Sequence, residues 1–171
     1  MTPQQLRALQ APLKEHYKAD PASAQRVFRA SGTLLPDRPS CRIETDTGTL
    51  MAGLHPAAGG DGNEACSGDL LLQSLVACAG VTFNVVATAM GIGFRSAEVI
   101  VEGDADFRGT LGIDKSVPVG VSHIRVRFEV DSDASDAQLS TLLQMTERFC
   151  VIYQTLKSPP NLQTQLVRKS A

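Results

Sequence analysis

The spacing of hydrophobic residues predicts a helix at the start of the chain. Apolar side chains recur at helical spacing, at Leu6, Leu9, Leu13 and Tyr17. This is the period of one face of an amphipathic helix. Pro3 suits the first turn of such a helix, and Asp20-Pro21 interrupts the pattern. We therefore expect an N-terminal helical extension over residues 1–20, packed as an addition to the main body.

An alternating pattern follows this helix. Apolar pairs at Val27-Phe28 and Leu34-Leu35 come before a turn at residues 36–39, and two short alternating runs cover residues 41–46 and 49–52. Alternation is the period of a strand with one buried face, so this region predicts a small antiparallel meander. Residues 55–68 are rich in glycine and small polar residues, which predicts a long loop.

A long apolar segment predicts the central element of the fold. Residues 69–90 are apolar on nearly every side of a helix, so we expect a helix that is buried all round. Asp69 lies near its start, where a carboxylate interacts favourably with the helix dipole. Gly91-Ile92-Gly93 would end the helix.

The second half of the chain predicts two strands, a helix and a last strand. The strands cover residues 96–107 and 121–130. Ser135 and Gln138 have the spacing of a capping box, and apolar residues then follow one side of a helix as far as Tyr153. Residues 162–167 alternate again. The order of elements predicts the α+β class with antiparallel sheets.

Composition limits the setting and the partners. The chain has 171 residues, enough for one domain, and its net charge of −2 comes from dispersed charged residues. Nucleic acid is therefore not an expected partner. The first residues lack the pattern of a secretory signal, and Gly80, Thr82 and Asn84 break the apolar stretch after Leu70. We expect a cytoplasmic protein without a membrane span.

Cysteine is the residue type with the most suggestive placement. A reducing cytosol seldom holds structural disulfides, the spacing offers no Cys-x-x-Cys pair for zinc, and three scattered histidines suggest no metal site. Cys78 lies on a mostly apolar side of its helix, which suits a site for an apolar substrate, although free cysteine is also a common packing residue. Cys150 lies either well inside a helix or, if the helix breaks near Phe149, at a new helix N-terminus that favours thiolate.

These two cysteines predict a two-thiol redox site. One thiolate can attack an electrophilic oxygen, and the second thiol can then close a disulfide. We expect Cys41 to pack within a strand and Cys66 to be an exposed loop thiol, although Cys66 is close enough in sequence to Cys78 to be a rival disulfide partner. A reactive thiolate needs a nearby cation, which a carboxylate often holds in place. The candidates for these roles are Arg38, Arg42, Glu64 and Asp69.

The segments around both cysteines resemble a known family. The run Gly68-Asp69-Leu70-Leu71-Leu72-Gln73-Ser74-Leu75-Val76-Ala77-Cys78 is similar to the Pro-x-Glu-Leu-Leu-Leu-x-(Ala/Ser)-Leu-x-x-Cys signature of the OsmC/Ohr family of osmotically inducible and organic hydroperoxide resistance proteins. Glu147-Arg148-Phe149-Cys150-Val151 resembles its second cysteine segment, and the order of elements matches over a domain at 24–170. Asp69 stands at the family's Glu position, Ser67 at its Pro position and Val151 where many active peroxidases have Pro, which is typical of the OsmC-like branch.

The resemblance implies an OsmC-like fold in an intertwined homodimer. Antiparallel sheets would pack around long central helices, with active sites at the subunit interface and no bound cofactor. Cys78 would be the peroxidatic cysteine and Cys150 the resolving one, Arg38 would match the family's arginine by place, and Asp69 would match its acid. The implied substrates are organic hydroperoxides, and the implied reductant is a dihydrolipoyl group or another external dithiol.

Three functions are compatible with this pattern. We expect a two-cysteine thiol peroxidase that acts in oxidative stress defence. The alternative is a non-enzymatic OsmC-like protein that binds a small apolar ligand at the dimer interface and keeps its thiols reduced. A redox sensor that changes partner when Cys78 is oxidised would require a large conformational change, which nothing in the sequence indicates.

Overall fold

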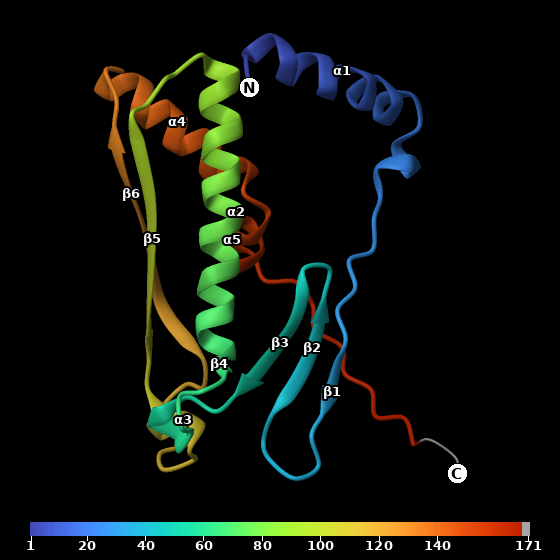
Figure 1. Ribbon diagram of the computed structural model, residues 1–171, viewed down its shortest axis with the longest axis vertical. Coiled ribbons are helices and arrows are strands. Elements are labelled where there is room, and N and C mark those ends of the chain that lie inside the picture. Colours follow the sequence, from blue (N-terminus) through green and yellow to red (C-terminus); the bar gives the residue numbers. More distant parts are fainter. Residues whose placement is uncertain (169–171) are drawn as a thin grey trace.

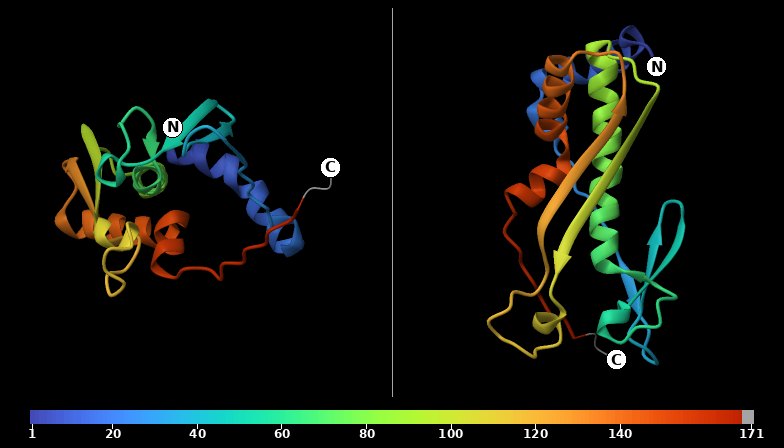
Figure 2. Two further views of the ribbon diagram at one scale, coloured as in Figure 1. Left: turned by 90° about the horizontal axis from the view of Figure 1, so that it is seen from below. Right: turned by 90° about the vertical axis from the view of Figure 1, so that its left-hand side faces the viewer.

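The computed structural model describes residues 1–168 and confirms the α+β class (Figure 1). Residues 169 and 170, the last two of the predicted main domain, lie outside the described residues. One long helix runs along a two-stranded sheet, and a four-stranded sheet lies at the end where this helix begins (Figures 1 and 2). The helices are α1 (Pro3–Ala19), α2 (Ser67–Met90), α3 (Phe107–Thr110), α4 (Asp136–Phe149) and α5 (Val151–Lys157), with short 3-10 helices η1 (Pro21–Ala24) and η2 (Pro56–Ala58). The strands are β1 (Gly32–Leu34), β2 (Cys41–Thr45), β3 (Gly48–Gly53), β4 (Ala65–Cys66), β5 (Ser96–Ala105) and β6 (Val121–Asp131).

The predicted N-terminal helix is present as α1. Thr2 and Gln5 form a capping box at its start, which satisfies backbone N–H groups that the first turn leaves free. Leu6 is buried, and α1 contacts α2. Leu9 and Leu13, on the same apolar face, remain 61% and 51% exposed. Only the first part of this face is therefore covered within one chain.

The predicted meander is present, with two differences. The strands β1, β2 and β3 pair antiparallel in that order, but β1 begins only at Gly32. Val27 and Phe28, expected in a strand, lie in an extended segment and are 81% and 91% exposed, because they have no neighbouring strand to pair with. The predicted loop at residues 55–68 contains β4, which pairs with β3 in parallel.

The second sheet consists of β5 and β6, paired antiparallel from Ser96 opposite Asp131 to Ala105 opposite Val121. The prediction of a last strand at residues 162–167 is wrong. These residues have no strand structure, and Leu166 is 99% exposed. An alternating sequence forms a strand only where another strand satisfies its backbone N–H and C=O groups, and the chain leaves both sheets after α5 (Figure 1).

The core lies between α2, sheet β5–β6 and the helices α4 and α5. Phe83 stacks on Phe128 of β6, with ring centroids 4.9 Å apart, and Leu142 of α4 is fully buried beside them. The expectation that α2 is buried all round is wrong for a single chain, because one side faces outward with Val81 67% exposed. By length and composition α2 could cross a membrane, with a mean hydropathy of 1.9, but the core helix of a soluble protein passes the same test.

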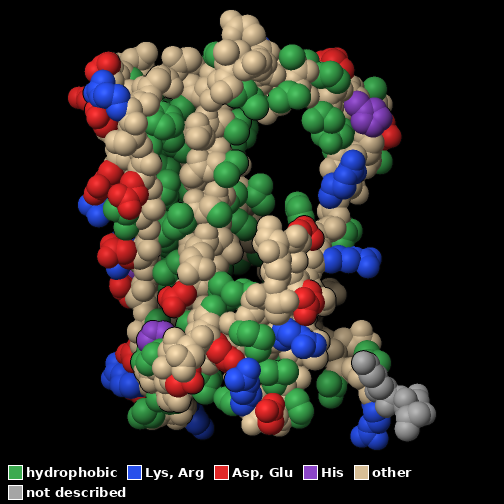
Figure 3. All heavy atoms as spheres, viewed as in Figure 1, with side chains coloured by type: hydrophobic (Ala, Val, Ile, Leu, Met, Phe, Trp, Pro, Cys, Tyr) green, Lys and Arg blue, Asp and Glu red, His purple; other side chains and the backbone are tan. Residues whose placement is uncertain are grey.

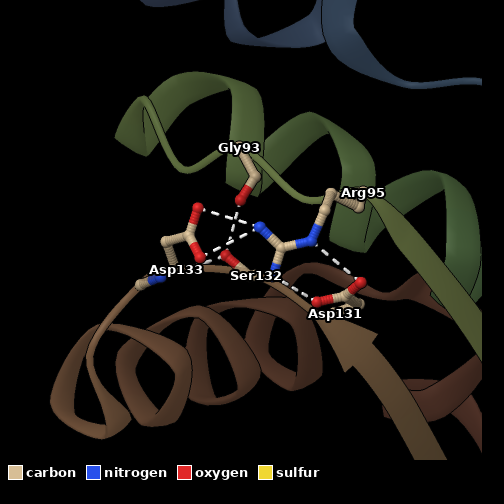
Figure 4. Close-up of polar contacts among 6 residues, drawn as sticks. Gly93, Arg95, Asp131, Ser132 and Asp133 are labelled. Atoms are coloured by element: carbon tan, nitrogen blue, oxygen red, sulfur yellow. Dashed lines mark hydrogen bonds and ion pairs between the residues drawn. The ribbon is translucent and has the colours of Figure 1, made fainter.

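A charged cluster joins two turns at one end of the molecule (Figure 4). Arg95, just before β5, pairs with Asp131 at the end of β6 and with Asp133 in the turn that leads to α4. Ser132 donates a hydrogen bond to the carbonyl oxygen of Gly93 at 2.5 Å. The cluster therefore fixes the end of α2 against the start of α4.

Candidate functional site

The helix breaks at Cys150. Its backbone is extended, with φ −71° and ψ 109°, so α4 ends at Phe149 and α5 begins at Val151. The Cys150 N–H bonds to the carbonyl oxygen of Thr146, while its sulfur accepts a hydrogen bond from the Tyr153 N–H at 3.5 Å. Of the two placements that the sequence leaves open, the structure has the break and the new helix N-terminus.

Cys78 and Cys150 lie against each other. Leu75 and Ala79 of α2 form one buried cluster with Cys150, and Cys78, half-buried on the same helix, packs against it. The Cys78 sulfur lies near the backbone N–H groups of Val151 and Ile152, at the first turn of α5, and near the Cys150 thiol. None of the four cysteines, which all lie within the described residues, forms a disulfide. The structure therefore brings together the two cysteines on which the predicted redox site depends.

These contacts shift the two thiol pKa values in opposite directions. Burial, the largest influence, raises the pKa of Cys78, but hydrogen bonds from Ile152, Cys150, Val151 and the Thr82 hydroxyl outweigh burial and lower that pKa below its ordinary value. Burial is also the largest influence on Cys150, and together with its donation to Cys78 it raises the Cys150 pKa. Cys78 is therefore the thiol that ionises first.

An apolar stripe surrounds Cys78 on the outward side of α2. Leu71, Val81 and Val85, spaced along the same side of the helix as Cys78, are exposed, and so are Phe149 and Val151 beside Cys150. An organic substrate with an apolar body could therefore reach the Cys78 sulfur along this stripe.

A second polar cluster lies at the start of α2. Arg38, in the turn between β1 and β2, pairs with Glu64 at 3.1 Å. Ser40, which is buried, donates a hydrogen bond from its hydroxyl to the other oxygen of the same carboxylate at 2.5 Å. The carboxylate packs so closely on β3 that a Cβ atom at Gly53 would clash with it, which explains the glycine. Glu64 and Ser40 therefore hold Arg38 in a defined place.

The other candidates for a cation and its acid lie apart from this cluster. Arg42 pairs with Glu44 on β2 at 3.3 Å. Asp69 lies in the first turn of α2 and is exposed. Cys41 and Cys66 are partly buried in β2 and β4.

The cysteine pair and the Arg38–Glu64 cluster are separated within one chain. Cys78 follows the start of α2 by 11 residues (Ser67 to Cys78), which corresponds to about 17 Å along the helix axis. The hydrogen bonds that lower the Cys78 pKa come from polar groups and the backbone, not from an arginine.

Ser40 was not among the predicted site residues, and its only signal in the sequence is its position directly after the Arg38-Pro39 turn.

The described residues contain a groove that could bind a small ligand but no metal site. Within residues 1–168, no group of three His, Cys, Asp or Glu side chains is arranged to hold a metal ion. A groove of about 320 Å³ lies between β6 and α5, with Ile124, Val126 and Leu156 among its lining residues. Leu75, one helical turn before Cys78, also lines it.

Comparisons with known proteins agree on one family. A family model described as OsmC-like protein matches residues 60–165. The comparison with curated proteins gives no match.

Solved structures share the fold. An OsmC like protein from Mycoplasma pneumoniae is 20% identical with a TM-score of 0.65, over 79% of this chain and 90% of that chain. An organic hydroperoxide resistance protein OsmC from Legionella pneumophila is 14% identical with a TM-score of 0.60, over 78% of this chain and 93% of that chain. An organic hydroperoxide resistance protein from Elizabethkingia anophelis, with thiocyanate bound, is 12% identical with a TM-score of 0.61, over 79% of this chain and 92% of that chain. At these identities the likeness shows a common fold.

Proposed function

Because the chain belongs to the OsmC-like protein family, we propose that it is a thiol peroxidase that reduces organic hydroperoxides in a two-cysteine cycle. The observation that carries the proposal is the contact between Cys78 and Cys150, in which the half-buried Cys78 has the lowered pKa and the buried Cys150 has the raised pKa. Related solved structures are named as organic hydroperoxide resistance proteins, which supports the same reaction class.

The proposed cycle assigns one step to each thiol. The Cys78 thiolate attacks the distal oxygen of the hydroperoxide, the O–O bond breaks, and the alcohol leaves with one proton while Cys78 becomes a sulfenic acid. The Cys150 thiol then attacks the sulfenic sulfur, so that a disulfide forms and water leaves. An external dithiol, such as a dihydrolipoyl group, reduces the disulfide and is itself oxidised. Cys150 stays protonated and in place until the sulfenic acid forms, as its raised pKa favours.

The proposal includes a soluble cytoplasmic homodimer with the site at the subunit interface. The apolar stripe around Cys78 is open in one chain, and a second copy would cover it. Arg38 lies apart from Cys78 of its own chain, and Glu64 and Ser40 hold it in a defined place, as a site built from two chains requires. We assign to Arg38 the role of cation beside the reacting peroxide, with Glu64 as the acid that orients it. Arg42 remains the alternative cation, and Asp69 remains the alternative acid.

Turnover of cumene hydroperoxide with dihydrolipoamide tests this function directly. The wild type should turn over, the Cys78→Ser variant should be inactive, and the Cys150→Ser variant should react once and then become overoxidised at Cys78. Cys41→Ser serves as a matched control, because it removes a thiol outside the pair. A Cys78→Ser variant with full activity would exclude the proposed cycle.

A second candidate is favoured by the groove between β6 and α5. Its volume of about 320 Å³ suits a small ligand, whose apolar part would contact Ile124, Val126 and Leu156 while His123 and Lys157 provide polar contacts, and such a protein would need no thiol chemistry. Counting free thiols before and after one equivalent of cumene hydroperoxide separates the two functions. A peroxidase loses two thiols together, whereas a binding protein keeps all four.

A further inference from the structure

The N-terminal arm, residues 3–31, has an apolar surface that its own chain does not cover. The arm comprises α1, η1 and an extended segment that leads to β1. Leu6 is buried and α1 contacts α2, but Leu9 and Leu13 are exposed along the same face of α1. Val27 and Phe28 in the extended segment are among the most exposed apolar side chains of the protein. The family match at residues 60–165 does not include this arm.

The arm also encloses an opening. The space-filling view shows a gap that passes through the molecule between the arm and α2, bordered by hydrophobic side chains (Figure 3). Protein interiors are packed to the density of organic crystals, so a single folded chain does not keep a gap of this kind between apolar surfaces. A segment of another molecule must occupy it for these side chains to leave water.

The exposed area is of the size that a second copy of the chain would cover. The chain exposes 13063 Å², whereas a folded monomer of 18.2 kDa exposes roughly 8100 Å², a difference of about 5000 Å². This difference reaches the range of obligate dimer interfaces, which bury roughly 2000–5000 Å² or more in total. A small ligand or a short peptide would cover only a small part of it.

We propose that the N-terminal arm is a clasp for a second copy of this chain: the partner enters the opening, and Leu9 and Leu13 pack against it. The inference rests on the homodimer included in the proposed function and adds an element that holds the two copies together. The opening lies beside α2, the helix that carries the exposed stripe (Figures 1 and 3), so the same partner can cover both surfaces. The clasp therefore also helps to close the site around Cys78.

A photo-crosslinker tests the contact in the full-length protein. We would place p-benzoylphenylalanine at position 13, mix light and isotope-labelled chains, and analyse crosslinked peptides after irradiation. The expected result is a crosslink between a light and a heavy chain. The same group at position 11, on the opposite face of α1, should give little interchain crosslink. Crosslinks only within one chain, or equal yields at both positions, would overturn the proposal.

A pair of charge variants measures the contribution of the clasp. Leu9→Asp with Leu13→Asp should raise the dimer dissociation constant at least about tenfold, a loss of about 1.4 kcal/mol. Ala8→Asp with Ala11→Asp adds the same charge to the opposite face and should leave it unchanged. Equal dissociation constants, or a wild type that sediments as a monomer, would overturn the clasp. Turnover of cumene hydroperoxide is measured separately, so an inactive protein with the interchain crosslink would contradict the peroxidase and not the clasp.

Discussion

Cys78 and Cys150 lie in contact and have pKa values shifted in opposite directions. The cause is the helix break, which aims the backbone N–H groups of Val151 and Ile152 at the Cys78 sulfur and buries the Cys150 sulfur behind it. When Cys78 loses its proton, Cys150 keeps its own, and the Cys150 S–H group stabilises the thiolate of Cys78. The order of reaction in the proposed cycle follows from this one relationship.

The first prediction concerns the pH dependence of thiol alkylation. Only the thiolate reacts with iodoacetamide, so the reactivity of a cysteine is lost as the pH falls through its pKa. Cys78 should react at a lower pH than an ordinary thiol, and Cys150 only at a higher pH than an ordinary thiol. Mass spectrometry of peptides after brief labelling from pH 5 to pH 10 would measure both profiles at once.

The Cys150→Ala variant provides the control for this prediction. It removes the thiol that donates to Cys78, so the Cys78 profile should move to higher pH. A profile that moves to lower pH, or does not move, would show that Cys150 does not stabilise the thiolate.

The second prediction concerns Thr82, one turn after Cys78 on α2. Hydrogen bonding from its hydroxyl lowers the pKa of Cys78, although less than the backbone N–H groups of Val151 and Ile152 do. A neutral hydrogen bond contributes about 0.5–1.5 kcal/mol, so Thr82→Val should slow alkylation of Cys78 at pH 7 roughly two- to tenfold. Thr88→Val, further along the same helix, should leave the rate unchanged. Equal rates in both variants would remove Thr82 from the site.

Patterns within single elements were sufficient to predict most of the fold. Periodicity and capping residues predict features that depend only on neighbours along the chain. Examples are the Ser135 and Gln138 capping box, the long α2 helix and its end at Gly91. Residues 162–167 have the same kind of alternation but no strand, because pairing depends on a distant partner that alternation cannot reveal. The exposed side of α2 shows the same limit. An apolar pattern on all sides predicts that a helix is buried, but it does not show whether residues of the same chain or of another chain cover it.

The site was predictable to a similar extent. Residue type and family resemblance singled out Cys78 and Cys150, and the structure brings them together. The groups that tune them were harder to predict, because the Val151 and Ile152 donors are backbone N–H groups that any residue carries. Glu64 was one of two acids weighed beside Arg38. Only the fold shows which carboxylate meets that arginine, since the two are separated by the whole of β2 and β3.

The third prediction concerns Ser40 as a positioning residue. Its hydroxyl donates to the Glu64 carboxylate that pairs with Arg38, and hydrogen bonds to charged groups contribute about 1.5–3 kcal/mol. Ser40→Ala should lower kcat/KM for cumene hydroperoxide roughly tenfold or more, as the loss of such a bond implies. The alkylation profile of Cys78 should stay unchanged, because Ser40 acts on Arg38 and not on the thiol.

Two further variants make this prediction specific. Ser40→Thr keeps the hydroxyl and should recover most of the activity. Ser140→Ala, on the surface of α4, should leave kcat/KM unchanged. A Ser40→Ala variant with wild-type kcat/KM would mean that the Arg38–Glu64 pair needs no support from Ser40 or takes no part in the reaction.

The last prediction uses two adjacent leucines of α4 to test the core. Leu142 is fully buried beside Phe83, whereas Leu143 is 39% exposed. Leu142→Ala leaves a cavity that the neighbours can fill only in part, so it should lower the free energy of unfolding by about 2–5 kcal/mol. Leu143→Ala should cost about 1 kcal/mol or less, because much of its side chain already meets water. Urea unfolding of both variants at one protein concentration measures the difference, and equal losses would mean that α4 does not pack on α2 through Leu142.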